Sequence, residues 1–131
     1  MKTNKRPLLN GLAGLAVLLS GTPLLAHHAF SAFDMSKTIT VTGVVKEFQW
    51  INPHSWIQMM VTDASGNAVE WSIEMNSPLA SYRLGFRPRM LKAGDQVTIV
   101  ISPVKDGSAG GQFISAADST GRRLPDLKEP T

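Results

Sequence analysis

Short runs of alternating apolar and polar residues recur along the chain, and this period of two is typical of half-buried β-strands. Residues 38–42 and 44–50 form two such runs on either side of Gly43, which predicts one long strand with a bulge or bend at the glycine. Further runs cover residues 54–61, 69–75, 96–101 and 112–117. Turn-forming residues between them, including Asn52-Pro53, predict short connections.

The same alternation predicts which side chains face the core, because successive side chains of a strand point to opposite faces. In residues 54–61, one predicted face is inward: Ser55, Ile57, Met59 and Val61. The opposite face carries His54, Trp56, Gln58 and Met60. In residues 69–75, the odd positions are apolar and predicted to face the core, whereas Glu70, Ser72 and Glu74 are predicted to face solvent.

One helix is predicted between the third and fourth strands. Asn76 or Ser77 can cap it, Pro78 suits its first turn, and Gly85 ends it. A bent first strand and a helix between strands 3 and 4 are the arrangement of the OB-fold. We therefore predict an all-β protein, a small five-stranded OB-like barrel with one short helix; the alternative is an open β-sandwich.

The first 26 residues have the pattern of a secretion signal. A basic start is followed by an apolar run at residues 8–19, a Gly-Thr-Pro break and the small residue Ala26. The apolar run is shorter than the about 20 residues that span a bilayer, although an uncleaved membrane anchor remains the alternative. We predict a signal peptide at 1–26, an N-terminal arm at 27–37, the barrel domain at 38–120 and a loose tail at 121–131.

Charge and cysteine content exclude several classes of function. Three of the 13 basic residues precede residue 27, whereas all 10 acidic residues follow it, so the remainder is balanced. Nucleic-acid binding requires a basic surplus, so we expect no nucleic-acid partner, and no membrane contact after signal cleavage. The chain has no cysteine, which excludes disulfides and thiolate metal sites.

Histidines at the predicted cleavage site suggest a metal site. Cleavage after Ala26 makes His27 the first residue, and its α-amine and imidazole can chelate one metal ion in the manner of a histidine brace. His28 and His54 are the other two histidines, and nitrogen ligands of this kind suit copper. Met60 shares the predicted face of His54, and its thioether would suit Cu(I). The simpler interpretation is that His27 and His28 are tail residues and that His54 hydrogen-bonds within a turn.

Two other groups of residues are candidates for contact with a ligand or partner. Arg83, Arg87 and Arg89 lie close together in sequence beside aromatic residues, and Trp56 is predicted to point outward. Such a surface can hold a carboxylate or phosphate, or a saccharide. Glu70 and Glu74 are explained by the solvent face of a strand and need no catalytic role. No nucleophile elbow, phosphate loop or metalloprotease motif is present.

The chain resembles a family of small secreted bacterial proteins classed as a domain of unknown function. The resemblance rests on Ala26-His27-His28-Ala29-Phe30, on Asn52-Pro53-His54-Ser55-Trp56 and on the Gly-Asp turn at residues 94–95. It covers the whole predicted mature domain, with Ala29 where relatives usually have serine. The resemblance implies export and one β domain, and it brings no established activity.

These patterns together predict a periplasmic or secreted binding or accessory protein rather than an enzyme. It would hold a copper-like ion through His27 and His54, with His28 as a further candidate ligand, and its partner would be a periplasmic metalloenzyme or another exported protein. The alternative is a metal-free interaction module that binds a partner protein or saccharide over Trp56 and the arginines. A copper-dependent oxidase is the third hypothesis.

Overall fold

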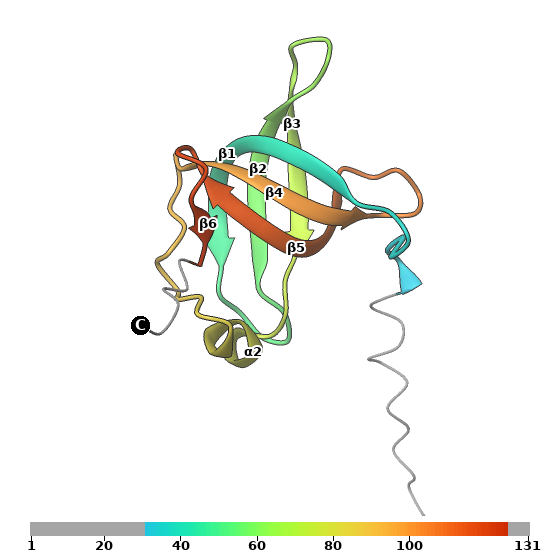
Figure 1. Cartoon of the computed structure of the whole chain (residues 1–131). Coiled ribbons are helices and arrows are strands. Elements are labelled where there is room, and N and C mark those ends of the chain that lie inside the picture. The colour runs from blue at the N-terminus through green and yellow to red at the C-terminus, as the bar shows by residue number, and fades with distance from the viewer. Residues whose placement is uncertain (1–30, 126–131) are drawn as a thin grey trace, which may run out of the picture.

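The structure is a computed structural model that describes residues 31–125. Six strands form one sheet in the order β3-β2-β1-β4-β5-β6, and an additional pairing between β3 and β5 closes β1–β5 into a barrel (Figure 1). The elements that lie wholly within the described residues are β1 (Ile39–Gln49), β2 (Trp56–Thr62), β3 (Ala68–Glu74), α2 (Pro78–Arg83), β4 (Gln96–Pro103), β5 (Gly110–Asp118) and β6 (Arg123–Leu124). The prediction of an OB-like barrel with one short helix between the third and fourth strands is confirmed.

Strand β1 belongs to both halves of the barrel. Its first half pairs with β4 from Ile39 to Val44, and its second half pairs with β2 from Val44 to Gln49. Gly43 lies at the change of partner, where an added Cβ would be 2.3 Å from the carbonyl oxygen of Met60. The register shift lies between Val45 and Glu47, so the predicted irregularity is present but comes after the glycine.

Parallel pairing between β3 and β5 closes the barrel. Ser72, Ile73 and Glu74 are in register with Gly110, Gly111 and Gln112. A Cβ on Gly110 would lie 2.4 Å from the Ser72 carbonyl oxygen, and one on Gly111 would lie 2.3 Å from that of Ser102. These contacts are far below van der Waals distance, so the closure depends on two adjacent residues without side chains.

The core consists of the inward side chains of all five barrel strands, and the predicted core positions Ile57, Met59 and Ile73 are confirmed. The side chains that are almost completely buried include Val45, Ile57, Met59, Ile73, Val97, Ile99 and Ile101. Trp71 and Val61 pack against this cluster while keeping partial exposure. From the predicted N-terminal arm, Phe33 is also buried and forms an isolated antiparallel bridge with Val104.

Helix α2 lies across one end of the barrel, beside the connection from β1 to β2 (Figure 1). It begins where predicted, because the Ser77 hydroxyl accepts a hydrogen bond of 3.3 Å from the Ala80 N–H and Pro78 occupies the first turn. Gly85 follows the helix with a φ of 97°, as expected for a glycine after a C-terminus. The next residue, Phe86, is buried and packs edge-on against Phe113 at a centroid distance of 5.5 Å.

The last part of the described chain is more ordered than we expected. Arg123 and Leu124, assigned above to a loose tail, pair with Ala117 and Ala116 of β5. The Asp118 carboxylate holds the intervening turn, because it accepts hydrogen bonds from the Thr120 hydroxyl and from the N–H groups of Thr120 and Arg122. These bonds, with that from the Thr120 side chain largest, lower the pKa of Asp118 below its usual value.

Gly43→Ala tests the close contact between β1 and β2. The new methyl group would meet the Met60 backbone, which cannot move without breaking strand pairing. We expect a loss of about 2–4 kcal/mol in the free energy of unfolding, measured by urea denaturation. The matched control is Thr40→Ala, an exposed position of the same strand, which should change stability little. Equal stability of both variants would contradict this interpretation of Gly43.

Candidate functional site

His54 and Glu74 form a hydrogen-bonded pair at the end of the barrel where β2 begins and β3 ends. His54 lies in the connection before β2, and Glu74 is the last residue of β3. The neighbouring backbone is fixed on both sides, because the Met75 N–H donates to the Ser55 carbonyl oxygen at 2.8 Å and the Ser55 N–H donates to Asn76 at 3.1 Å. The pair joins His54 Nδ1 to Glu74 Oε1.

The two side chains differ in exposure, and this difference leaves the histidine accessible to a further ligand. The Glu74 side chain is 10% exposed, whereas the His54 side chain is 34% exposed. A buried carboxylate requires a partner to remain favourable, and the imidazole Nδ1 supplies it. Since Nδ1 is engaged, Nε2 is the ring nitrogen that remains for another ligand. Metal-binding histidines commonly have this arrangement, in which a carboxylate orients the ring through its second nitrogen.

Glu74 was predicted to lie on a solvated strand face, and that prediction is wrong. Its position in the alternation is correct, since it points away from Ile73 and Met75. It is nevertheless buried, because it lies at the β3–β5 closure, in register with Gln112 on one side and Trp56 on the other. Alternation predicts the face of a side chain but not what covers that face, so the sequence carried no signal for this pair.

A chain of polar contacts continues from this site over the outer face of β1, β2 and β3. The Ser72 hydroxyl donates to Gln58 at 2.6 Å, and the Gln58 amide donates to Gln49 at 3.4 Å. Gln49 in turn donates to Glu47 at 3.1 Å. Trp56 is in register with Gln49 and Glu74, so it lies among these polar side chains, on the outer face where it was predicted.

Met60, the other candidate ligand among the described residues, does not converge on His54. Met60 shares the outer face but pairs with Glu70, at the opposite end of β2. Six residues of strand span about 20 Å, so Met60 does not join His54 in one site. Arg83 ends α2, and Arg87 and Arg89 follow it.

The proposed metal ligands are incomplete within residues 31–125. His27 and His28 lie outside the described residues. Among the described residues, no group of three or more His, Cys, Asp or Glu side chains is placed to hold a metal ion. A metal site of three or more such ligands at His54 would therefore require ligands from outside the described residues.

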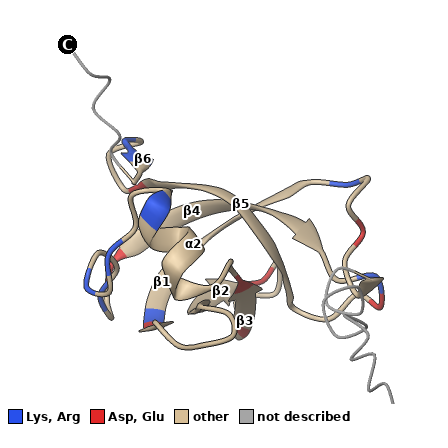
Figure 2. Cartoon of the chain, turned by 90° about the horizontal axis from the view of Figure 1, so that it is seen from below, with Lys and Arg blue, Asp and Glu red and all other residues tan. Residues whose placement is uncertain are grey.

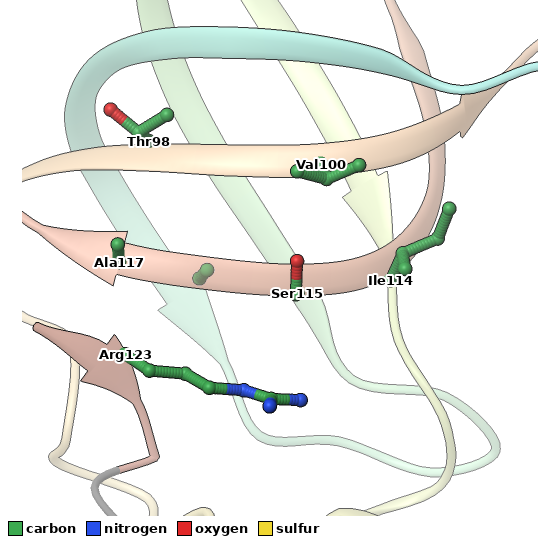
Figure 3. Close-up of a pocket in the computed structure, with 7 residues that line it drawn as sticks. Thr98, Val100, Ile114, Ser115, Ala117 and Arg123 are labelled. Carbon is green, nitrogen blue, oxygen red and sulfur yellow. The ribbon is translucent and has the colours of Figure 1, made fainter. Parts of the chain in front are cut away.

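A shallow hollow lies elsewhere, on the outer face of β4 and β5 (Figure 3). It has a volume of about 460 Å³, and Thr98, Val100, Ser115 and Ala117 line it together with Arg123 from β6. Among the described residues, Arg123 is the only charged one in this lining. The described lining has hydroxyl groups but no histidine or carboxylate that could act as a general base toward them.

Comparison with known protein families identifies one family whose model matches this chain. The model of a family of unknown function, DUF6152, matches residues 16–113. The chain belongs to this family. This DUF6152 chain has no match among curated proteins. Among solved structures it is similar to the mitochondrial single-stranded DNA binding protein Rim1 from S. cerevisiae, with a TM-score of 0.47 and 12% sequence identity. That match covers 63% of this chain and 94% of the other.

The coupling between His54 and Glu74 can be measured by a double-mutant cycle. We expect His54→Ala and Glu74→Gln to be non-additive in urea denaturation, with a coupling of about 1–3 kcal/mol, because the pair is charge-assisted and partly buried. Lys46 and Glu70, an exposed ion pair of 2.7 Å on the same sheet, provide the matched control. That pair should show a coupling of about 0–1 kcal/mol. Additive effects at His54 and Glu74 would contradict the assigned contact.

Proposed function

We propose that this protein is an exported binding or accessory protein that holds a copper-like metal ion through His54 and the mature N-terminus. The N-terminal ligands would be the α-amine and imidazole of His27, with His28 as a further nitrogen donor. The observation that supports this proposal is the hydrogen bond between His54 Nδ1 and the buried Glu74 carboxylate. It presents His54 as an oriented imidazole that is one-third exposed.

The chemistry of the ligands agrees with a copper-like ion. Neutral imidazole and amine nitrogens are preferred by Cu(II), and the absence of cysteine leaves nitrogen as the strongest available donor. Glu74 adds a negative charge behind the imidazole, which increases the basicity of the ring and offsets part of the charge of the metal. An oriented histidine of this kind loses less conformational freedom on binding than an exposed one.

The length of the N-terminal segment is compatible with a contact to His54. Phe33 is fixed at Val104, directly after β4, and β5 lies between β4 and β3. Three strand spacings of about 4.8 Å separate this anchor from β3, or about 15 Å. The Ala32 carbonyl oxygen accepts a hydrogen bond from the Lys105 N–H, so the tether consists of the five residues from Ala32 back to His27, which span at most about 17 Å. The tether is therefore long enough to approach the end of β3, where Glu74 and His54 lie.

Cu(II) titration of the exported protein tests the proposal. The periplasmic form is first checked by mass spectrometry for an N-terminus at His27. We expect one stoichiometric, nitrogen-rich type-2 signal in electron paramagnetic resonance, because amine and imidazole ligands would converge on one ion. One residue added before His27 should abolish this signal, since it removes the α-amine as a terminal ligand.

The same titration identifies adventitious binding. A signal that survives both the N-terminal addition and His54→Ala would come from unspecific capture by histidine and would refute the proposed site. A mature N-terminus several residues away from His27 would refute the brace while leaving the His54–Glu74 pair unchanged.

Glu74→Gln provides a separate prediction, because it keeps the size of the side chain and removes its charge. We expect the affinity for Cu(II) to fall about 10- to 100-fold, as is common when the carboxylate behind a ligating histidine is lost. The matched control is Glu70→Gln, which removes an exposed carboxylate from the same strand. Isothermal titration calorimetry measures both variants, and an equal effect at the two positions would count against a role for Glu74 in binding.

A second function is favoured by the hydrogen-bonded side chains around Trp56. An aromatic ring among amide and carboxylate groups suits a saccharide or a polar protein surface, so a metal-free interaction module is the alternative proposal. The arginines at residues 83–89 would extend such a surface. Weak and heterogeneous Cu(II) binding by the correctly processed protein would make this alternative the better proposal.

A further inference from the structure

The end of the barrel that carries α2 exposes an unusual number of large apolar side chains. Leu79 is 61% exposed, Leu84 53%, Tyr82 52% and Ile51 52%. The first three belong to α2 and its C-terminus, and Ile51 lies in the connection from β1 to β2 beside it (Figure 1). Single exposed apolar residues are common, but a group of this kind at one end of a small domain indicates a contact surface.

The segment that contains α2 and the residues after it has an excess of positive charge. Between residues 76 and 95 the chain has four basic residues, Arg83, Arg87, Arg89 and Lys92, and one acidic residue, Asp95. Figure 2, which views the molecule from below, shows Lys and Arg on α2 and along the segment that follows it. The chain after residue 26 has equal numbers of basic and acidic residues, but basic residues are in excess in this segment.

Arg87 is held in a defined position within this group. Its guanidinium lies 3.8 Å from the centre of the Tyr82 ring and donates hydrogen bonds to the carbonyl oxygens of Tyr82 and Phe86, at 3.1 and 2.7 Å. These contacts use one terminal nitrogen, Nη1, and leave other N–H groups of the fork for an external acceptor. A planar guanidinium fixed in this way suits an oxyanion such as a phosphodiester.

We propose that the α2 end of the barrel, defined by Ile51, Leu79, Tyr82, Leu84 and the arginines at 83, 87 and 89, docks on the surface of an anionic phospholipid bilayer. The arginines would bind lipid phosphates, and the leucines would enter the boundary between headgroups and acyl chains. Tyr82 has the amphipathic ring that is favoured at this depth. The inference is independent of metal binding, and it revises our expectation that the mature protein makes no membrane contact.

A bilayer accounts for both features of this surface together. A nucleic-acid backbone or a free phosphate would explain the arginines but not the four exposed apolar side chains. The described residues include no helix that is long and apolar enough to cross a membrane. A protein partner with an acidic rim is the competing occupant, and the experiment below separates the two.

Vesicle co-sedimentation of the exported protein tests the proposal. One vesicle preparation contains phosphatidylcholine alone, and the other contains equimolar phosphatidylcholine and phosphatidylglycerol. We expect binding to the second preparation only, and weaker binding at high salt because the phosphate contacts are screened. Arg83→Gln with Arg89→Gln should lower the partition coefficient about 25-fold, since each basic residue at such a surface contributes about fivefold. Leu79→Ser with Leu84→Ser should lower it by about tenfold or more.

The matched control is Met35→Ser, which replaces a side chain that is 56% exposed in the N-terminal segment, outside this surface. It should bind like the wild type, and all variants share one N-terminus, so any contribution from the first residues cancels. The exposed positions of the substituted residues leave the core intact, which circular dichroism verifies. Equal binding to both vesicle preparations, insensitivity to the arginine and leucine variants, or binding of glycerol phosphate without vesicle binding would overturn the proposal. Absence of any vesicle binding would overturn it as well and would leave a protein as the occupant of this surface.

Discussion

Closure of the barrel by β3 and β5 is the constraint on which the other features depend. Parallel strands must approach to normal sheet spacing at the point where β5 also pairs with β4. Gly110 and Gly111 allow this approach, because backbone oxygens occupy the space that their side chains would need. Closure then buries the outer side of β3 at Glu74, and the buried carboxylate takes His54 as its partner. The site at the start of β2 is thus a consequence of how the sheet closes at the end of β3.

Much of the fold follows from local rules that act on few residues. Alternation along residues 54–61 and 69–75 predicts the core side chains Ile57, Met59 and Ile73, because the inward residues other than Ser55 are apolar. The sequence Ser77-Pro78 with Gly85 predicts both ends of the helix. Alternation does not predict which strands pair with one another in the sheet. The β3–β5 pairing joins residues nearly 40 positions apart in the sequence, and no feature of either segment identifies the other as its pairing partner.

The same difference explains the outcome at the candidate site. His54 was identified because it could join His27 and His28 in a metal site and follows a Pro turn. Glu74 was set aside as a solvated strand residue, since its importance arises from long-range pairing. The tail residues Arg123 and Leu124 illustrate a related point. Their short run has little intrinsic preference for strand, and the turn held by Asp118 brings them to β5. In both cases a polar side chain acquires its role only once the chain has folded.

The buried anchor at Phe33 has a consequence for the residues that precede it. A group attached five residues before the fixed Ala32 is confined to a sphere of about 17 Å radius around that point. Such confinement corresponds to an effective concentration on the order of millimolar or more at the adjacent barrel surface. A ligand supplied by the N-terminus would therefore gain affinity from its attachment alone. Removing Phe33 from the core would reduce this gain without altering a single ligating atom.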